Sequence, residues 1–300
     1  MSKILILMLW MTCIEVNNVS VKDRKIRTLI IDGFSNHDWP QTSGLIKSIL
    51  ETSGLVTVDI STIPIRQGVV DSTWKVDLKA YDVVIQNTNN IDDTLLRWPR
   101  HMEERLEEYI VSGGGLYVFH SANNAFPHWE AYNQMIGLGW RSPIQGKALR
   151  IEDDKLVEIP VGEGRATYHG ARQDEVIVLL DRHPINHGYP SEWQTPDMEL
   201  YKYARGPANN LTVLSYATDE ETGYNWLMEW VVAYGKGRVY SSSMGHLWKG
   251  QTNPEGFRCV GFRTTMIRVV EWLARASVSY PIPEDFPDAL HIRLVDSTDD

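Results

Sequence analysis

Between Ile26 and His120, short apolar runs alternate with amphipathic helical patterns, and this alternation restricts the possible folds more than any other feature of the chain. The apolar runs are rich in β-branched residues and predict buried strands at residues 26–31, 55–62, 81–86 and 115–120. The helical patterns cover residues 40–53 and 98–112, and a glycine follows each of them. Strands and helices that alternate at this spacing predict parallel crossover units and therefore an α/β fold.

The pattern changes after Trp140, where predicted strands follow one another without helices of matching length. They lie in KALRIED, EVIVLLD, LTVLSYA and NWLMEWVVAYGKGRVYSSS, and the AYGKGR within the last segment is typical of a hairpin turn. We therefore expect one domain over residues 25–280, with a parallel sheet, helices on both faces and an antiparallel extension. Residues 281–300 begin with three prolines in seven residues, which predicts a loosely packed C-terminal extension.

The first residues carry the pattern of an export signal. Lys3 precedes an apolar run from Ile4 to Thr12, and polar residues follow. The run is too short for a transmembrane helix, so we expect residues 1–20 to be a signal peptide of a periplasmic or secreted protein. Cys13 leaves a lipoprotein anchor open, and a first core strand in a cytoplasmic protein is the alternative.

Charge, cysteine content and hydropathy exclude several classes of protein. The chain has 29 basic and 39 acidic residues and no long basic run, so we expect no nucleic-acid partner. Its two cysteines exclude a disulfide framework. No segment after the N-terminal run is apolar enough to span a bilayer, which predicts no integral membrane segment.

Polar and aromatic side chains follow several of the predicted strands, and ligands of open parallel sheets bind beyond the carboxyl ends of the strands. The candidate substrate-binding residues are Asn36, Asp38, Trp39, Asn87, Asn89, Asn123, Asn124 and Trp129. The candidate catalytic residues are His120, His37, His246 and His169. Amides can pair with sugar hydroxyls as donor and acceptor, and imidazole titrates near neutral pH. The alternatives are that the asparagines form turns and caps and that the histidines are wall residues.

Nucleophilic catalysis and metal binding are two further kinds of chemistry to which these segments are relevant. Ser121 does not stand in a Gly-x-Ser-x-Gly turn, and no cysteine lies near it, which excludes cysteine acyl transfer there. A divalent metal is left open, with the four candidate histidines as nitrogen ligands. The carboxylates considered for it are Asp32, Asp38 and Glu229. No tight His-x-x-x-His spacing supports a metal, so no cofactor follows from the sequence.

Several segments together resemble the trehalose-utilisation, or ThuA-like, family, from about Ile26 to about Arg275. They are IIDGFSNHDW, YDVVIQNTNN, GGGLYVFHSANNAFPHWEAYNQMIGLGWR, YHG, HPINHGYPSEW, ELYKYARGP and YGKGRVYSSSMGH. The resemblance implies a flavodoxin-like fold of the class I glutamine amidotransferase-like type. It also implies that HSANN replaces the turn that carries the catalytic cysteine of amidotransferases. Two departures are Met198, where an acid is more common in the family, and Ser121, where alanine is common.

The resemblance implies carbohydrate catabolism, with trehalose and its 3-keto derivatives as the associated substrates. We expect an enzyme that acts on such a disaccharide or 3-keto-glycoside by histidine acid–base or metal-assisted chemistry, and not an active glutamine amidotransferase. The alternative is a sugar-binding module without catalytic activity. Several histidines favour the enzyme, since binding alone needs amides and aromatic rings. The expected partner is a small carbohydrate, and the sequence leaves a homo-oligomer open.

Overall fold

The parallel half of the sheet has the strand order of flavodoxin-like proteins. The computed structural model describes residues 24–296. Five parallel strands lie in the order β2 (Val56–Thr62), β1 (Ile26–Asp32), β5 (Val83–Gln86), β6 (Gly115–Val118) and β14 (Gly237–Ser242). Counted along the chain, this is the order 2-1-3-4-5. The predicted α/β, flavodoxin-like fold is thus confirmed.

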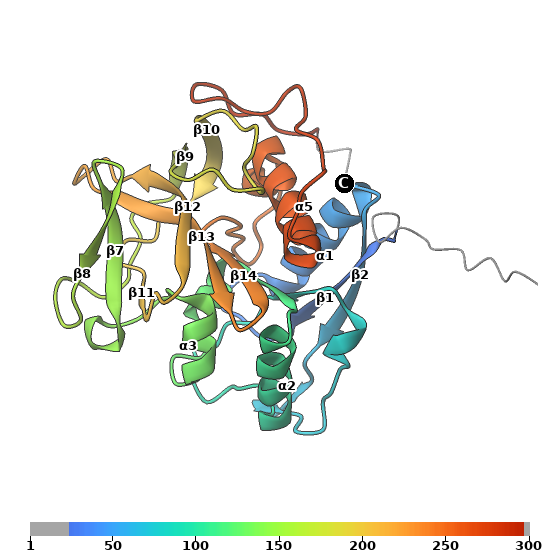
Figure 1. The fold of residues 1–300 in the computed structure, drawn as a ribbon. Coiled ribbons are helices and arrows are strands. Elements are labelled where there is room, and N and C mark those ends of the chain that lie inside the picture. The colour runs from blue at the N-terminus through green and yellow to red at the C-terminus, as the bar shows by residue number, and fades with distance from the viewer. Residues whose placement is uncertain (1–23, 297–300) are drawn as a thin grey trace, which may run out of the picture.

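The same sheet continues beyond β14 as an antiparallel extension (Figure 1). Its strands are β13 (Asn225–Tyr234), β12 (Leu211–Thr218), β9 (Gln173–Leu179) and β10 (Glu192–Met198). Tyr234 pairs with Gly237, which confirms the predicted hairpin turn. Three further strands join through β13, and a small separate pair lies elsewhere. These are β7 (Lys147–Glu152), β8 (Lys155–Ile159), β11 (Arg205–Gly206), β3 (Ile65–Arg66) and β4 (Val69–Val70).

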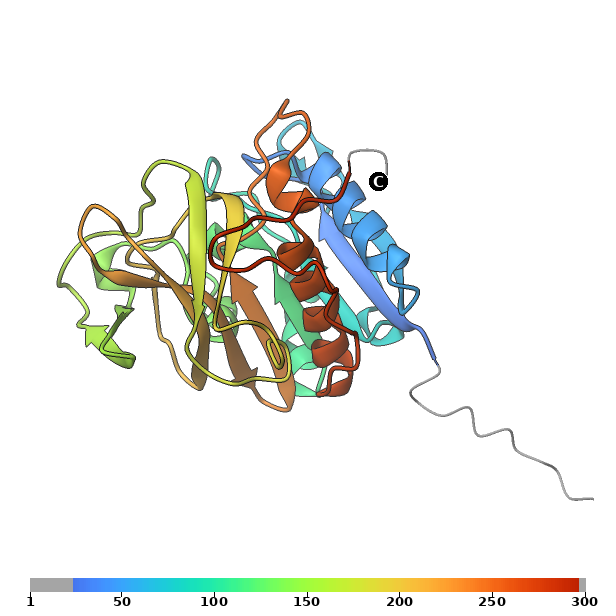
Figure 2. The ribbon, with the colours of Figure 1, turned by 90° about the horizontal axis from the view of Figure 1, so that it is seen from above.

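Helices cover both faces of the parallel half (Figures 1 and 2). On one face lie α1 (Trp39–Thr52) and α5 (Val260–Arg275), and on the other lie α2 (Arg100–Val111) and α3 (Glu130–Ile136). The remaining helical turns are η1 (Leu78–Ala80), η2 (His120–Asn124), η3 (Pro143–Gln145) and α4 (Glu255–Arg258). Within residues 24–296, no helix is both long and apolar enough to cross a bilayer.

Strand β1 is buried at every position except Arg27. Ile30 packs into the core beneath α1 and α5, whereas its neighbours Leu29 and Ile31 pack into the core beneath α2 and α3. Successive side chains of a strand point to opposite faces, so a strand covered on both faces needs apolar residues throughout. This double burial holds the carboxyl end of β1 in place, and the candidate site begins there.

The C-terminal segment is packed more closely than the sequence predicted. Gln194 N donates to Asp288 O at 3.0 Å, and Val260 N donates to Arg293 O at 2.9 Å. The ring of Phe286 lies 4.3 Å from that of Tyr189. The expectation of a loosely packed extension is therefore wrong for residues 281–296, because backbone hydrogen bonds and the Phe286 ring attach this segment to the domain. The predicted signal peptide, residues 1–20, lies outside the described residues.

Candidate functional site

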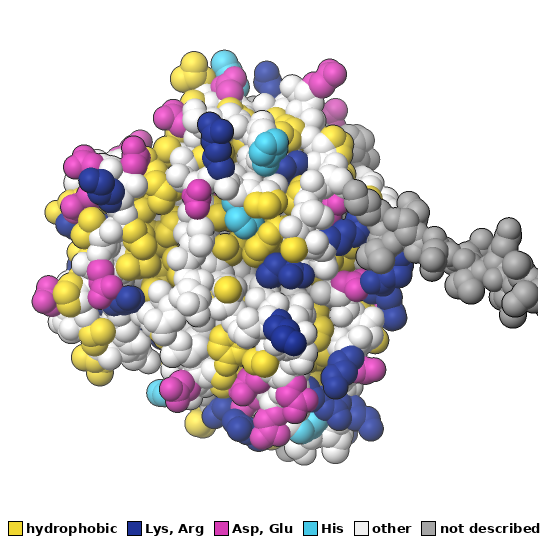
Figure 3. Space-filling model, in the orientation of Figure 1, with side chains coloured by type: hydrophobic (Ala, Val, Ile, Leu, Met, Phe, Trp, Pro, Cys, Tyr) yellow, Lys and Arg dark blue, Asp and Glu magenta, His cyan; other side chains and the backbone are white. Residues whose placement is uncertain are grey.

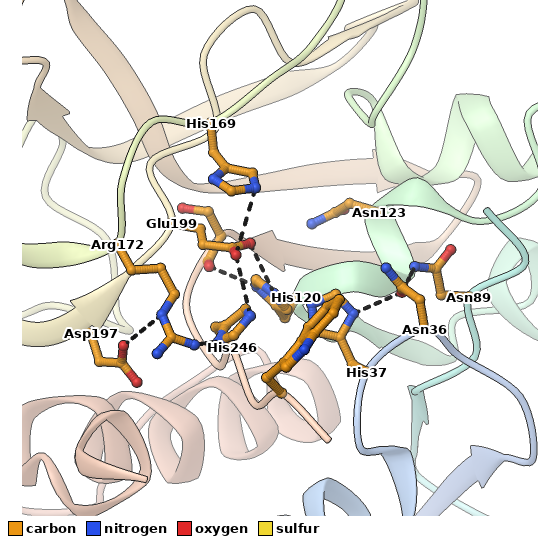
Figure 4. A network of polar contacts seen from close by, with 12 residues as sticks. Asn36, His37, Asn89, His120, Asn123, His169, Arg172, Asp197, Glu199 and His246 are labelled. Carbon is orange, nitrogen blue, oxygen red and sulfur yellow. Dashed lines mark hydrogen bonds and ion pairs between the residues drawn. The ribbon is translucent and has the colours of Figure 1, made fainter. Parts of the chain in front are cut away.

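Three histidines from the ends of three parallel strands lie in mutual ring contact (Figure 4). His37 follows β1, His120 follows β6 and His246 follows β14. The ring centroid of His37 is 5.0 Å from that of His120 and 5.0 Å from that of His246, and the other two are 5.4 Å apart. The three side chains are buried. The structure thus brings together three histidines that the sequence placed on one edge of the sheet.

The carboxylate of Glu199 lies at the centre of this cluster, and sequence analysis did not assign it to the site. Its Oε1 is 3.2 Å from His246 Nε2 and 3.7 Å from His169 Nε2, and its Oε2 is 3.7 Å from His120 Nε2. Glu199 follows strand β10, in which Pro196 interrupts the usual strand pattern. An acidic residue directly after a predicted strand would have indicated a site residue, but the sequence did not predict strand β10.

His120 occupies a strained position at the turn after β6. Its backbone φ is +42°, in the left-handed region that bulky residues avoid. Such strain persists where the surroundings fix the backbone, and it is common at functional sites. Here Asn123 Nδ2 donates to the Ser242 carbonyl at 3.0 Å, and Tyr132 Oη donates to the Ala122 carbonyl at 2.8 Å.

Arg141 holds the same turn from the other side. Its guanidinium is buried and donates to the carbonyl oxygens of Asn124 at 3.1 Å and Ala125 at 2.6 Å. It also donates to Asn133 Oδ1 at 2.8 Å. Burial lowers the pKa of Arg141 to about 10, so the side chain stays charged at neutral pH. A charged donor with several carbonyl partners thus fixes the segment that carries His120.

The tautomer of His120 follows from its backbone partner. His120 Nδ1 lies 2.8 Å from the Ser243 carbonyl oxygen, which can only accept, so Nδ1 carries the proton. The lone pair of the neutral ring is therefore on Nε2, which is buried and has no hydrogen-bond partner within residues 24–296. That atom faces Glu199 Oε2.

The tautomer of His37 follows from a chain of three hydrogen bonds. Ile91 N donates to Asn89 Oδ1 at 3.0 Å, so the other amide atom, Nδ2, donates to Asn36 Oδ1 at 2.7 Å. Asn36 Oδ1 must then accept from His37 Nδ1, at 2.8 Å. The lone pair of His37 is on Nε2, which is buried and, among the described residues, unpartnered. Asn36 and Asn89 thus orient a histidine in the structure.

His246 has the opposite tautomer. Arg172 Nη1 lies 2.6 Å from His246 Nδ1, and arginine can only donate, so Nδ1 accepts and the neutral ring carries its proton on Nε2. That proton faces Glu199. Gly245 before it has a φ of +102°, and a Cβ there would lie 2.5 Å from the ring of Phe119. Glycine at this position therefore allows the loop to bring His246 into the cluster.

Burial favours the uncharged forms of these groups. Burial, aided by the positive charges of His169, Lys249 and Arg172, lowers the pKa of His37 to about 4. Burial, aided by His37 and Arg172, lowers the pKa of His246 to about 3. The pKa of His120 also falls well below its ordinary value, mainly by burial. Burial raises the pKa of Glu199, although His169 and Arg172 oppose that shift. The imidazoles are therefore neutral at pH 7.

Four groups of the site could hold a metal ion. The ligand atoms of His37, His120, His246 and Glu199 all lie within 4.8 Å of one another. The three carboxylates considered from the sequence lie elsewhere. Asp32 accepts from Ser43 Oγ at 2.6 Å, Asp38 caps α1, and Glu229 accepts from Ser215 and Tyr240 inside the sheet core. None of these three carboxylates belongs to the group of four, whose carboxylate, Glu199, comes from the antiparallel half.

Several predicted substrate-binding residues support helix α1 instead of facing the histidines. Asp38 accepts from Gln41 N at 3.2 Å as the helix cap. Asn87 Nδ2 donates to the Trp39 carbonyl at 3.3 Å and to Ser43 Oγ at 3.0 Å. Trp39 is the first residue of the helix and is half-buried. These contacts agree with the alternative interpretation, in which such polar residues form helix caps and turns and do not bind substrate.

The remaining predicted residues divide between the core and the site. Trp129 is buried in the core beneath α2 and α3, where its ring stacks on Tyr132 at 5.3 Å and its Nε1 donates to Glu107. It does not join the histidine cluster. The side-chain oxygens of Asn123 and Asn124 are buried and, within the described part of the chain, have no hydrogen-bond partner. Each therefore keeps an unused hydrogen-bond acceptor beside the site.

Aromatic rings border the cluster on its exposed side. Trp248 is 50% exposed, and its ring lies parallel to that of His246, with centroids 6.0 Å apart. The ring of Trp140 lies 5.8 Å from that of His169, and Trp140 and Asn124 both line a surface cavity of about 370 Å³. Figure 3 shows histidine side chains near the middle of this face, beside hydrophobic and charged side chains. The indole rings of Trp248 and Trp140 offer apolar faces on which a ring-shaped ligand can stack.

Comparison with known proteins decides the family. A sequence model of the ThuA family, described as trehalose utilisation, matches residues 27–273. The chain belongs to the ThuA family. None of the curated proteins compared with the chain matches it. This ThuA-family protein is 31% identical to a ThuA-like protein of Parabacteroides merdae ATCC 43184, over 91% of this chain and 98% of that one, with a TM-score of 0.84.

A second solved structure is less similar to the chain. A cytoplasmic protein of Salmonella typhimurium LT2 is 16% identical, over 83% of this chain and all of that one, with a TM-score of 0.49. The family match confirms the resemblance noted in the sequence. The chain is therefore a protein related to trehalose utilisation.

Proposed function

We propose that this ThuA-family protein is an enzyme that acts on a trehalose-type disaccharide or its 3-keto derivative by proton transfer between histidines and the sugar. The observation that carries the proposal is the arrangement around Glu199. Three imidazoles lie within 3.7 Å of its carboxylate. A sugar-binding site needs amides and aromatic faces, whereas this site also holds several imidazoles, the side chains that most often accept and donate protons in catalysis.

The reaction we propose begins beside the keto group. A neutral imidazole takes the proton from carbon 2, which the carbonyl at carbon 3 makes acidic. The electron pair of that bond forms a double bond between carbons 1 and 2, and the bond from carbon 1 to the glycosidic oxygen breaks. The leaving oxygen takes a proton from an acid of the site. His169 Nδ1 donates to the Gly170 carbonyl at 2.6 Å, so its Nε2 carries a lone pair suited to the first step.

Other residues suit the binding of the sugar. The unpartnered side-chain oxygens of Asn123 and Asn124 can accept hydrogen bonds from hydroxyl groups. Trp248 and Trp140 offer ring faces at the exposed side of the cluster. No cysteine lies in the turn of His120, so we infer that the protein is not an active glutamine amidotransferase.

The test is incubation of the purified protein with 3-keto-trehalose and with trehalose, with and without chelator, followed by product analysis. We expect cleavage of the keto sugar. An unsaturated keto sugar as first product indicates elimination, whereas direct release of two saturated sugars indicates hydrolysis. His120→Asn removes the imidazole and keeps a residue that tolerates positive φ, so folding should be retained.

We expect His120→Asn to lose about a hundredfold to ten-thousandfold in turnover, because it removes the imidazole that faces Glu199 in the middle of the proposed site, and losses of this size are typical for groups of acid–base sites. His187→Ala is the matched control, because His187 is exposed and lies outside the cluster. Tight binding of either sugar without any turnover would refute the enzyme and favour a sugar-binding module.

A further inference from the structure

We propose that His37, His120, His246 and Glu199 form a binding site for one divalent transition-metal ion. Their ligand atoms lie within 4.8 Å of one another, and all four residues are buried. The inference deepens the proposed function, since any part of the ion in catalysis rests on that function. The metal site itself stands on the geometry of the four side chains.

The site contains acceptors that face one another without a donor between them. The lone pairs of His37 Nε2 and His120 Nε2 have no hydrogen-bond partner within residues 24–296. His120 Nε2 faces a second acceptor, Glu199 Oε2, at 3.7 Å. Buried acceptors without a partner are unfavourable, and facing acceptors repel one another. A cation between them satisfies all three atoms at once.

The surrounding contacts fix the rings in the form that a metal requires. The Ser243 carbonyl holds the proton of His120 on Nδ1, and Asn36 holds that of His37 on Nδ1. Asn89 in turn holds Asn36. Metal-binding histidines usually donate their second ring N–H to a carbonyl or carboxylate in this way, which orients the ligand lone pair.

The donor set decides the class of ion. Three imidazole nitrogens and one carboxylate suit zinc, cobalt, iron, manganese or nickel in the divalent state. Magnesium and calcium prefer oxygen ligands and are expected to bind poorly here.

Arg172 competes with the ion for His246. Its Nη1 donates to His246 Nδ1, which leaves the proton on Nε2, the atom that faces Glu199. For Nε2 to bind an ion, this proton must leave or move to Nδ1, and Arg172 must release the ring. Arg172 has other partners, since its Nε lies 2.9 Å from Asp197 Oδ1 and its Nη1 lies 3.3 Å from Gln251 Oε1. Its charge and its hydrogen bond both oppose the ion.

With the three rings as ligands, proton transfer to the sugar falls to His169. Its Nε2 lies 3.7 Å from Glu199 Oε1, and its side chain is 37% exposed. His169 is outside the group of four and lies on the exposed side of it, in ring contact with Trp140. It can therefore meet the substrate while the other histidines hold the ion.

The experiment is metal titration of the whole protein. The purified protein is stripped with chelator, dialysed and titrated with Co²⁺, and the bound cobalt is followed by its visible absorption and by elemental analysis. We expect one cobalt per chain, displaced by Zn²⁺ but not by excess Mg²⁺ or Ca²⁺. Added Co²⁺ should also raise the unfolding temperature, since an ion bound to the folded state stabilises it.

The variants test the assigned ligands. His120→Asn and Glu199→Gln should each lose the cobalt spectrum, whereas His187→Ala should keep it. His37→Gln gives an independent ligand test if circular dichroism shows that either variant is unfolded. Arg172→Met should bind cobalt more tightly, by roughly tenfold, the lower end of the effects of residues next to metal ligands. Wild-type protein without stoichiometric cobalt, or folded ligand variants with an unchanged cobalt spectrum, would overturn the metal site.

The two proposals fail separately. One cobalt per chain without turnover of any keto sugar would refute the proposed function and leave the metal site standing. Full turnover by protein that neither contains nor binds a metal would refute the metal site and leave the function standing.

Discussion

His246 Nε2 lies 3.2 Å from Glu199 Oε1, and this contact joins the loop after the last parallel strand to the residue that follows the outermost antiparallel strand. The histidine follows β14 and the glutamate follows β10, two strands that are four positions apart in the sheet order. The antiparallel extension is therefore part of the site, because it supplies the carboxylate around which the histidines of the parallel half gather.

Glu199→Gln should abolish most activity while the protein stays folded. Glutamine keeps the shape of the side chain but cannot hold a negative charge or bind a proton, so we expect turnover to fall by about a hundredfold or more. Steady-state assays on the keto sugar measure the effect. Glu284→Gln, at an exposed loop position, is the matched control and should retain wild-type rates.

Asn89→Ala should lower turnover or metal affinity, although Asn89 itself does not contact a ligand. The change removes the donor that fixes Asn36 and, through it, His37. We expect a loss of roughly tenfold in turnover or metal affinity, as is usual for residues that orient ligands. Asn209→Ala, which removes an exposed amide contact to Gln134, is the control. If Asn89→Ala and Asn209→Ala have the same turnover and metal affinity, His37 does not depend on the hydrogen bond from Asn89 to Asn36.

Arg141→Lys should destabilise the fold. Lysine cannot donate at once to the carbonyls of Asn124 and Ala125 and to Asn133, as the guanidinium does. Hydrogen bonds made by a buried charged group stabilise a fold more than hydrogen bonds between neutral groups. We therefore expect the free energy of unfolding to fall by about 2–4 kcal/mol. Equilibrium unfolding in urea measures this decrease, and the dependence of the free energy of unfolding on urea concentration should stay unchanged. Arg100→Lys, at an exposed position, should change stability by less than about 0.5 kcal/mol.

Trp248→Ala should raise KM for the sugar more than it lowers kcat. The indole is 50% exposed beside His246, where it can stack on a sugar ring but reaches no reacting proton. Stacking of this kind contributes binding that is shared by ground and transition states, so its loss appears in KM. Tyr224→Ala removes an exposed ring elsewhere and serves as control. A loss confined to kcat would exclude the stacking role.

Stability should fall as pH rises from about 5 to 7 because of Glu175. Burial raises the pKa of this carboxyl to about 7, with further contributions from Glu220 and Asp219. In the unfolded chain the same carboxyl loses its proton near pH 4.3. Between these values the folded state holds more protons, so the free energy of unfolding decreases with increasing pH. The expected change is at most about 3 kcal/mol.

Glu175→Gln should remove this part of the pH dependence, because the amide does not titrate. Thermal unfolding at pH 5 and pH 7.5 measures it, with exposed Glu158→Gln as control. If the wild type and Glu175→Gln show the same pH dependence, the carboxyl is ionised in the folded state and the raised pKa is wrong.

The parallel half of the fold could be predicted because its signals are local. Strand β1 is covered on both faces and contains the apolar run Leu29–Ile31, and Gly54 and Gly113 follow the helices. Once the strands are parallel, their carboxyl ends share one edge. His37, His120 and His246 were expected together for that reason, and the structure brings them into ring contact.

The rest of the site depended on contacts that the local sequence does not encode. Strand β10 contains Pro196 and was not recognised, so Glu199 had no predicted place, and Asp32, Asp38 and Glu229 were considered in its stead. Arg172 lies 74 residues from His246 in the chain, yet it fixes the tautomer of that ring.

The sequence by itself determined the parallel strands, the helices on both faces and the histidines at the strand ends, because periodicity and glycine positions act over a few residues. Only the tertiary structure decided which way each side chain points. Trp129 is near His120 in the chain but turns into the core, whereas Glu199 is 79 residues from His120 and points at it. Strand pairing and burial across the whole chain set those directions, and no short segment contains that information.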